Sequence, residues 1–203
     1  RGLQLPPAVA PVQVVIVPIY RADDERARVL EVAEKLKDGL AGNGVRVKVD
    51  DRDQHRPGFK FSEWELKGVP VRIEIGPKDV DADRVTLATR FGGDKEEVPI
   101  SDVVAGMAAR LSKTQKDLFD DAVAFRDANM HDADSYDAFK EGITSEGGFW
   151  SGSWCGGDDC ENRVNKETSA TIRVLPLETE DPGAPCVVCG NPGTEKAIWA
   201  RAY

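Results

Sequence analysis

The first part of the chain alternates between short apolar runs and amphipathic stretches. Residues 12–19 form an apolar, β-branched run bounded by prolines, which is typical of a buried strand. Residues 23–25 are all acidic and predict the start of a helix, whose apolar positions keep helical spacing as far as Gly42. Residues 45–49 alternate as a second strand. This strand–helix–strand order predicts a right-handed crossover and a parallel pair of strands.

The same reading predicts the remaining elements of a mixed α/β unit and of a smaller α+β unit. In the first, a loop is expected at 50–58 and a short helix at 59–67. Three strands are expected at 71–75, 85–89 and 96–99, and a long helix follows at 103–129. In the second, helices are expected at 135–143 and 161–168, and strands at 148–154, 170–176 and 194–201. We place the domain boundary near residue 110, which gives domains of 1–110 and 111–203.

Composition and charge narrow the classes of function. No apolar run approaches the ~20 residues that a membrane span needs, so no membrane partner is expected. The net charge of -9 argues against a simple nucleic-acid binder. Residues 45–78 are nevertheless basic, with a net charge of +2, and an RNA-binding surface would lie there. A solvated face of mixed charge is the alternative.

All four cysteines lie in the last 50 residues. Cys155 and Cys160 form a C-x4-C pair, and Cys186 and Cys189 form a C-x2-C pair followed by Gly190. Two such pairs can supply four thiolates to one tetrahedral zinc ion, which would be structural because no coordination position stays open for water. Two disulfides, or buried thiols without a metal, are the alternatives.

One long motif gives a family resemblance. Residues 55–79 read HRPGFKFSEWELKGVPVRIEIGPKD and resemble the signature of the class IIa anticodon-binding domain in its prolyl form. Residues 7–18 resemble the first strand of that domain, and the paired cysteines with the ending Arg201-Ala202-Tyr203 resemble archaeal/eukaryotic-type prolyl-tRNA synthetases. The resemblance implies a mixed five-stranded sheet with flanking helices, followed by a small zinc-binding domain. It also implies that a catalytic domain, with its sites for ATP and Mg, precedes Arg1 and is missing here.

The resemblance assigns anticodon-reading roles to two acid–base combinations, Glu65 with Arg72 and Asp79 with Lys78, and Arg72 is expected to be exposed at a strand end. Proline anticodons share two guanines, and the Watson–Crick edge of guanine offers one acceptor and two donors. A carboxylate accepts from both donors and a cation donates to the acceptor, as in the reading of splayed single-stranded bases. Ordinary surface ion pairs are the alternative for both combinations.

Other residues of this region have weaker assignments. Stacking on bases competes with a core position for three aromatic residues, Phe59, Phe61 and Trp64, and phosphate contacts compete with a solvated loop for His55, Arg56 and Lys60. His131 is expected to be structural, and no arrangement of a nucleophile with a base predicts a catalytic residue.

The expected function is therefore the tRNA-recognition part of a proline–tRNA ligase, inactive alone, with proline tRNA as partner. The full-length enzyme is expected to be a cytoplasmic homodimer whose terminal Tyr203 carboxylate turns toward the catalytic domain. Two other classes stay open: a small-molecule binder with its ligand at the strand carboxyl ends, and a stand-alone α/β RNA-binding or interaction module with a structural zinc site.

Overall fold

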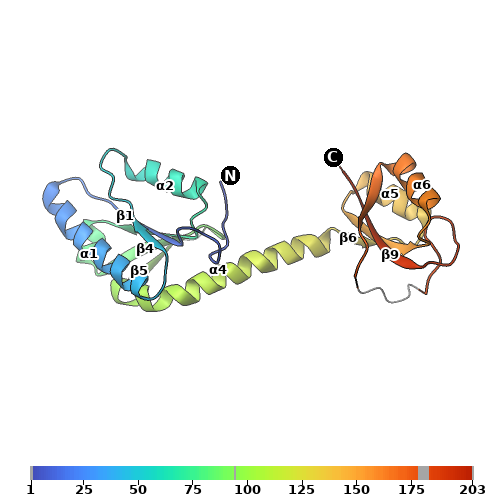
Figure 1. The fold of residues 1–203 in the computed structure, drawn as a ribbon. Helices are drawn as coiled ribbons and strands as arrows, with labels where there is room; N and C mark the ends of the chain where they lie inside the picture. The colour runs from blue at the N-terminus through green and yellow to red at the C-terminus, as the bar shows by residue number, and fades with distance from the viewer. Residues whose placement is uncertain (1, 94, 178–182, 203) are drawn as a thin grey trace. The chain divides into compact units, whose positions relative to one another are not determined.

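The computed structural model describes residues 2–93, 95–177 and 183–202, and it forms two compact units. Unit 1 comprises Arg1–Asp121 and unit 2 comprises Ala122–Tyr203 (Figure 1). Helix α4 (Ile100–Ala128) continues from the first unit into the second. The expected boundary near residue 110 thus falls inside one helix, and separation into independent domains at that point stays a prediction.

Unit 1 is built on a mixed five-stranded sheet with the order β2-β1-β3-β4-β5. Strands β1 (Val14–Pro18), β2 (Val47–Val49) and β3 (Val71–Ile75) run parallel, and β4 (Arg84–Thr89) and β5 (Lys95–Pro99) complete the sheet antiparallel. Three helices besides α4 flank it: α1 (Asp23–Gly42), α2 (Pro57–Leu66) and α3 (Pro77–Asp81). The expected sheet with flanking helices is confirmed.

The two faces of this sheet have different surroundings. On one face the side chains of alternate residues join a large apolar core with α1 and α4, including Ile16, Ile73 and Met107. On the other face Val15 and Val17 pack with Trp64 of α2 in a much smaller cluster. The period-2 alternation of a strand and the β1–β3 register place Arg72 and Glu74 on this second face, beside Val15 and Val17. Polar groups are therefore gathered on the α2 face of the sheet.

Unit 2 contains a four-stranded sheet with the order β6-β7-β9-β8, and its α+β class agrees with the expectation. Its strands are β6 (Met130–Asp132), β7 (Phe149–Trp154), β8 (Ala170–Val174) and β9 (Glu195–Arg201), and its helices are α5 (Tyr136–Ser145) and α6 (Asp158–Thr168). Phe139 and Trp199 are fully buried at the centre of its core. The expectation for Tyr203 lies outside the described residues.

Two short elements were not predicted. Residues 77–81 form one helical turn after β3, because Pro77 begins the turn and the Asp79 carboxylate accepts from the backbone N–H of Gly76 at 2.8 Å. Residues 130–132 pair in parallel with β7, and three residues are too few to reveal an alternation.

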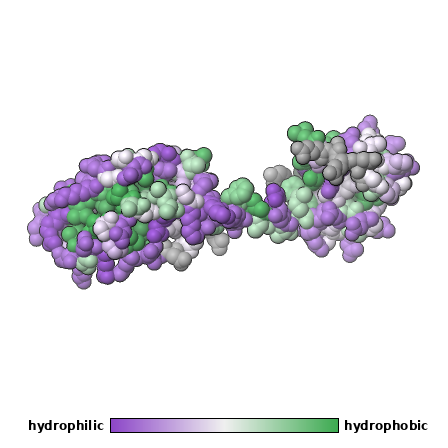
Figure 2. Space-filling view, turned by 90° about the horizontal axis from the view of Figure 1, so that it is seen from below, coloured by the Kyte–Doolittle hydropathy of each residue, from purple (hydrophilic) through white to green (hydrophobic). Residues whose placement is uncertain are grey.

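Polar and charged residues cover most of the visible surface, with apolar residues between them on unit 1 (Figure 2). Within the described part of the chain, no helix combines the length and the apolar character that crossing a membrane requires.

Candidate functional site

Arg72 lies at the centre of a charged cluster on the α2 face of the sheet. Its Nη1 donates to Glu65 Oε1 at 2.8 Å, and its Nε and Nη2 donate to Glu74 Oε1 at 3.1 and 2.9 Å. The guanidinium carbon lies 4.2 Å from the centre of the Phe61 ring, a cation–π distance. These contacts fix the guanidinium plane in one orientation.

The structure brings Glu65 and Arg72 together, as their predicted combination requires, but it corrects the location expected for Arg72. We expected an exposed residue at a strand end, and instead Arg72 is the second residue of β3 with a side chain only 10% exposed. All five residues of β3 are buried, because the apolar core covers one face and Phe61, Glu65 and neighbouring groups cover the other.

Glu74 and Lys95 belong to the same cluster and were not singled out from the sequence. Lys95 Nζ, on β5, lies 3.0 Å from Glu74 Oε2, so Glu74 holds two cations at once. A cavity of about 180 Å³ is lined by Glu65, Arg72 and Lys95 among others. A signal was present in the alternation of β3, which puts two opposite charges, at 72 and 74, on one side of a strand that is otherwise apolar.

Lys78 and Asp79 do not form a pair with each other. Asp79 is engaged by the backbone of Gly76, and no acidic group of the described chain lies within ion-pair distance of the exposed Lys78. Both residues follow the carboxyl end of β3, whereas Arg72 lies near its start. The four predicted anticodon-reading residues thus occupy two separate places, and their roles stay predictions.

The aromatic residues of α2 differ in burial. Trp64 is 6% exposed and its Nε1 donates to Asp50 Oδ2 at 2.8 Å, so the core interpretation is confirmed for this residue. Phe61 packs partly buried beneath Arg72. Phe59 is 53% exposed and stacks on His55 with ring centres 4.3 Å apart, which leaves an aromatic surface accessible to solvent. His55, Arg56 and Lys60 line a common cavity.

A buried carboxylate anchors the loop that precedes α2. Arg52 donates from Nε and Nη2 to the two oxygens of Asp50, at 2.7 and 2.8 Å, and it also contacts Glu63. Burial alone would raise the pKa of Asp50, but the hydrogen bonds from Arg52 and Trp64 hold it well below its usual range. Hydrogen bonds from Arg52 and then Lys67 lower the pKa of Glu63 to about 2. This network ties α2 to the sheet edge next to it.

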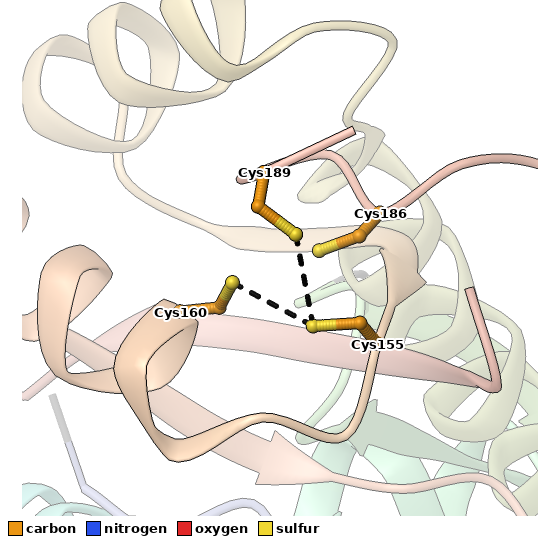
Figure 3. A group of neighbouring side chains, drawn as sticks. All are labelled: Cys155, Cys160, Cys186 and Cys189. Atoms are coloured by element: carbon orange, nitrogen blue, oxygen red, sulfur yellow. Dashed lines mark hydrogen bonds between the residues drawn. The ribbon is translucent and has the colours of Figure 1, made fainter. Parts of the chain in front are cut away.

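The four cysteines converge in unit 2 (Figure 3). Their sulfur atoms all lie within 4.8 Å of one another, and Cys155 Sγ is 3.6 Å from Cys160 Sγ and 3.8 Å from Cys189 Sγ. Zinc–sulfur bonds of about 2.3 Å in a tetrahedron put sulfurs about 3.8 Å apart, so these distances fit one ion. All four thiols are free, so this structure does not contain the two disulfides that were one alternative to a metal site. The four residues together could hold a metal ion.

Local backbone geometry prepares this cluster. Gly190 has a φ of +77°, the left-handed conformation that closes the C-x2-C turn. Burial alone would raise the pKa of Cys186, but backbone N–H groups of Cys189 and Val188 lower it to about 7. Burial raises the pKa of Cys160. The turn therefore favours the thiolate form of Cys186, which is the form that binds a metal.

Comparisons with known proteins match both units in order. Residues 13–110 match the model of the Anticodon binding domain, and residues 136–203 match that of Prolyl-tRNA synthetase, C-terminal. The chain is 47% identical over 206 residues to a proline–tRNA ligase of Chloroflexus aggregans, covering 100% of this chain and 42% of that protein. It is 44% identical over 212 residues to the chloroplastic/mitochondrial proline–tRNA ligase of Arabidopsis thaliana, covering 100% of this chain and 38% of that protein.

A solved structure agrees with these relatives. The crystal structure of prolyl-tRNA synthetase from Cryptosporidium parvum, complexed with L-proline and AMP, superposes with a TM-score of 0.87 at 29% identity, covering 100% of this chain and 43% of that chain. The chain thus spans about two fifths of the length of the proteins it matches. With both of its units matched in sequence and in fold, the chain belongs to the prolyl-tRNA synthetase family and comprises its anticodon-binding and C-terminal domains.

Proposed function

We propose that this chain is the tRNA-recognition part of a proline–tRNA ligase and that it reads the two guanines of the proline anticodon. The observation that carries the proposal is the Glu65–Arg72 pair beside a cavity on the α2 face of the sheet. Within the whole enzyme, this reading would support ATP-dependent prolylation of tRNA, with ATP and Mg bound by the separate catalytic domain. The fragment alone would be inactive.

The chemistry of the pair suits a guanine. The Glu65 side chain is 50% exposed and acts as the acceptor for N1–H and N2–H₂, while Arg72 acts as the donor to O6. Lys78 and Asp79 serve the second guanine from the other end of β3, with Lys78 donating and the free oxygen of Asp79 accepting. A well-made bidentate contact is worth roughly 1–3 kcal/mol of discrimination between bases.

Binding of RNA tests this proposal directly. The affinity of the chain is measured for proline tRNA and for the same tRNA with both anticodon guanines replaced. We expect about 10- to 100-fold weaker binding of the replaced tRNA, which corresponds to the energy of one or two base contacts. Equal affinities would reject anticodon reading and would favour the second candidate, a stand-alone α/β RNA-binding or interaction module.

For unit 2 we propose one structural zinc ion on Cys155, Cys160, Cys186 and Cys189. Four thiolate ligands fill a tetrahedral site, so the ion stabilises the fold and has no position for a reacting water. We propose that the full-length enzyme is a homodimer and works in the cytoplasm. The relative from Arabidopsis thaliana differs in location, since it is named as a chloroplastic/mitochondrial enzyme.

A further inference from the structure

A second cavity, of about 630 Å³, opens where β1 and β2 end, between the first residues of α1 and those of α2. Five of its lining side chains are cationic and two are acidic, so the lining is positive although the whole chain has a net charge of -9. None of the four predicted anticodon-reading residues lines it. Such a local excess of positive charge attracts anions.

Two of the five cations are already neutralised by carboxylates. Arg52 contacts Asp50 and Glu63, and Arg26 contacts Asp53, one of the two acids of the lining, at 3.3 Å. The second acid, Asp23, lies in the first turn of α1. Three cations remain, and none of them has an acidic partner within the described ranges: Arg21, Arg56 and Lys60.

Lys60 is the most informative of these three. It is 3% exposed, and its ammonium group donates once, to the backbone oxygen of Asp50 at 2.9 Å. An ammonium group has three N–H donors, so two have no partner in the described part of the chain. Burial lowers the pKa of Lys60, which reflects the cost of keeping this charge away from water. An anion in the cavity would offset that cost and accept the free donors.

The first turn of α2 adds to the positive field. No side chain caps this helix, no acidic residue occupies its first turn, and its N-cap residue Arg56 lines the cavity together with Pro57. The contrast with α1 is clear, because Glu25 there accepts from the backbone N–H groups of Arg21 and Ala22. The positive end of the α2 dipole is thus left for a group from outside the chain.

We propose that this cavity binds a phosphate group of the RNA backbone and is a second anchor for the tRNA, an inference that rests on the proposed function. Lys60 and Glu65 are five residues apart on α2, about 8 Å along the helix axis, so a strand whose guanine contacts Glu65 can place a neighbouring phosphate here. The stacked His55–Phe59 pair offers a surface for the base of that nucleotide.

The experiment compares two double variants with the same change in charge. Arg21→Gln/Arg56→Gln removes two exposed cations of the cavity, and Lys35→Gln/Lys37→Gln removes two lysines of α1 that do not line it. The affinities for proline tRNA and for the tRNA with replaced guanines are measured between 50 and 200 mM salt. We expect the cavity variant to bind both RNAs about 3- to 10-fold more weakly and to lower the salt slope by ~0.7 per lost contact, whereas the control keeps both values.

Lys60→Met extends the test to the buried cation. Methionine keeps an unbranched side chain that is one atom shorter and has no charge. Folding of this variant is checked by thermal unfolding, and it is expected to reproduce the weaker binding and the lower slope. Inorganic phosphate serves as a second probe, followed by NMR. The proposal would be overturned if Arg21→Gln/Arg56→Gln and Lys60→Met both bound RNA as tightly as the unmodified chain. This conclusion would hold even if inorganic phosphate bound in the cavity. Failure of the proposed anticodon reading can be distinguished from failure of this proposal, because it would appear as equal affinity of the unmodified chain for the two tRNAs.

Discussion

Arg72 directs two nitrogens, Nε and Nη2, at the same carboxylate oxygen of Glu74. Two donors converging on one acceptor hold the guanidinium plane more firmly than a single contact does. Because Glu74 is only 8% exposed, the pair lies largely out of water, where loss of one partner is costly.

Removing the arginine should therefore affect stability as well as binding. We expect Arg72→Ala to lower the free energy of unfolding of unit 1 by about 1–3 kcal/mol, because the buried Glu74 would lose one of its two cationic partners and keep only Lys95. Urea unfolding measures this effect. Arg84→Ala is the control, since its pair with Glu97 is exposed and worth about 0–1 kcal/mol. Equal stabilities of the two variants would contradict the importance of the buried pair.

Glu65→Gln separates base reading from folding. The side chain is half exposed, so the variant should unfold at the same urea concentration as the unmodified chain. A neutral amide cannot accept from both guanine donors as a carboxylate does, so the preference for the proline anticodon should fall about 10-fold. Glu31→Gln, on the exposed side of α1, should change neither quantity. Retained preference in Glu65→Gln would remove this residue from the reading of guanine.

Chelation should act on unit 2 and spare unit 1. We expect purified protein to contain one zinc ion per chain, and a strong chelator to reduce the thermal stability of unit 2, because metal binding contributes to the folding of the unit that holds it. Hydrogen exchange followed by mass spectrometry distinguishes the two units. Binding of tRNA should survive chelation. The zinc site would be disproved if the purified protein contained no metal, had four titratable thiols and was as stable with the chelator as without it.

Acid should weaken unit 1 through the Asp50 network. The pKa of Asp50 is depressed and that of Glu63 is lowered to about 2, so both contribute stability above about pH 4, the ordinary pKa of carboxyl groups. That stability is lost as the pH falls from about 4 toward 2. Urea midpoints across this range measure it. Asp50→Asn should reduce the loss, and an equally steep decline in this variant would exclude Asp50 as its source.

Gly142 should resist substitution although it lies inside a helix. A Cβ atom at this position would come within 2.0 Å of the Trp150 ring, so Gly142→Ala is expected to destabilise unit 2 by about 1–3 kcal/mol. Gly106→Ala is the matched control, since its Cβ would meet no atom within 4 Å and alanine favours a helix by roughly 0.5–1 kcal/mol. Thermal unfolding should show a lower stability for Gly142→Ala and a higher stability for Gly106→Ala. A stabilised Gly142→Ala would refute the close packing.

The strands and long helices were predictable because their patterns extend over several residues. The strand at 71–75 was placed with its observed bounds, and the spacing of the cysteines predicted a group that the structure brings together. What the sequence could not provide was the surroundings of single residues. Arg72 is the example, since its burial depends on Phe61 and Glu65, which reach it from another element.

The cluster around Arg72 extends to β5 for a similar reason. Lys95 is more than 20 residues from Glu74 along the chain, and their contact follows from the antiparallel register of β3, β4 and β5. The alternation along one strand shows on which face of the sheet a residue lies, but it does not identify the partner of that residue on a strand two places away. Phosphate contacts were one of the two expectations for His55, Arg56 and Lys60, but the cavity that they share was not predicted, because α1, α2 and two strand ends form it together.

The ion pair between Arg72 and Glu65 makes each residue an internal competitor of the base that the other would bind. Any nucleotide that enters must first separate the two side chains, which lie 2.8 Å apart. If Glu65 and Arg72 read guanine as proposed, its two donors and its acceptor would replace the partner that each side chain gives up. A base whose Watson–Crick edge matches only one of the two side chains would leave the other charge without a partner. The ion pair would then raise the selectivity of the site, because a mismatched base would carry the cost of that unpaired charge.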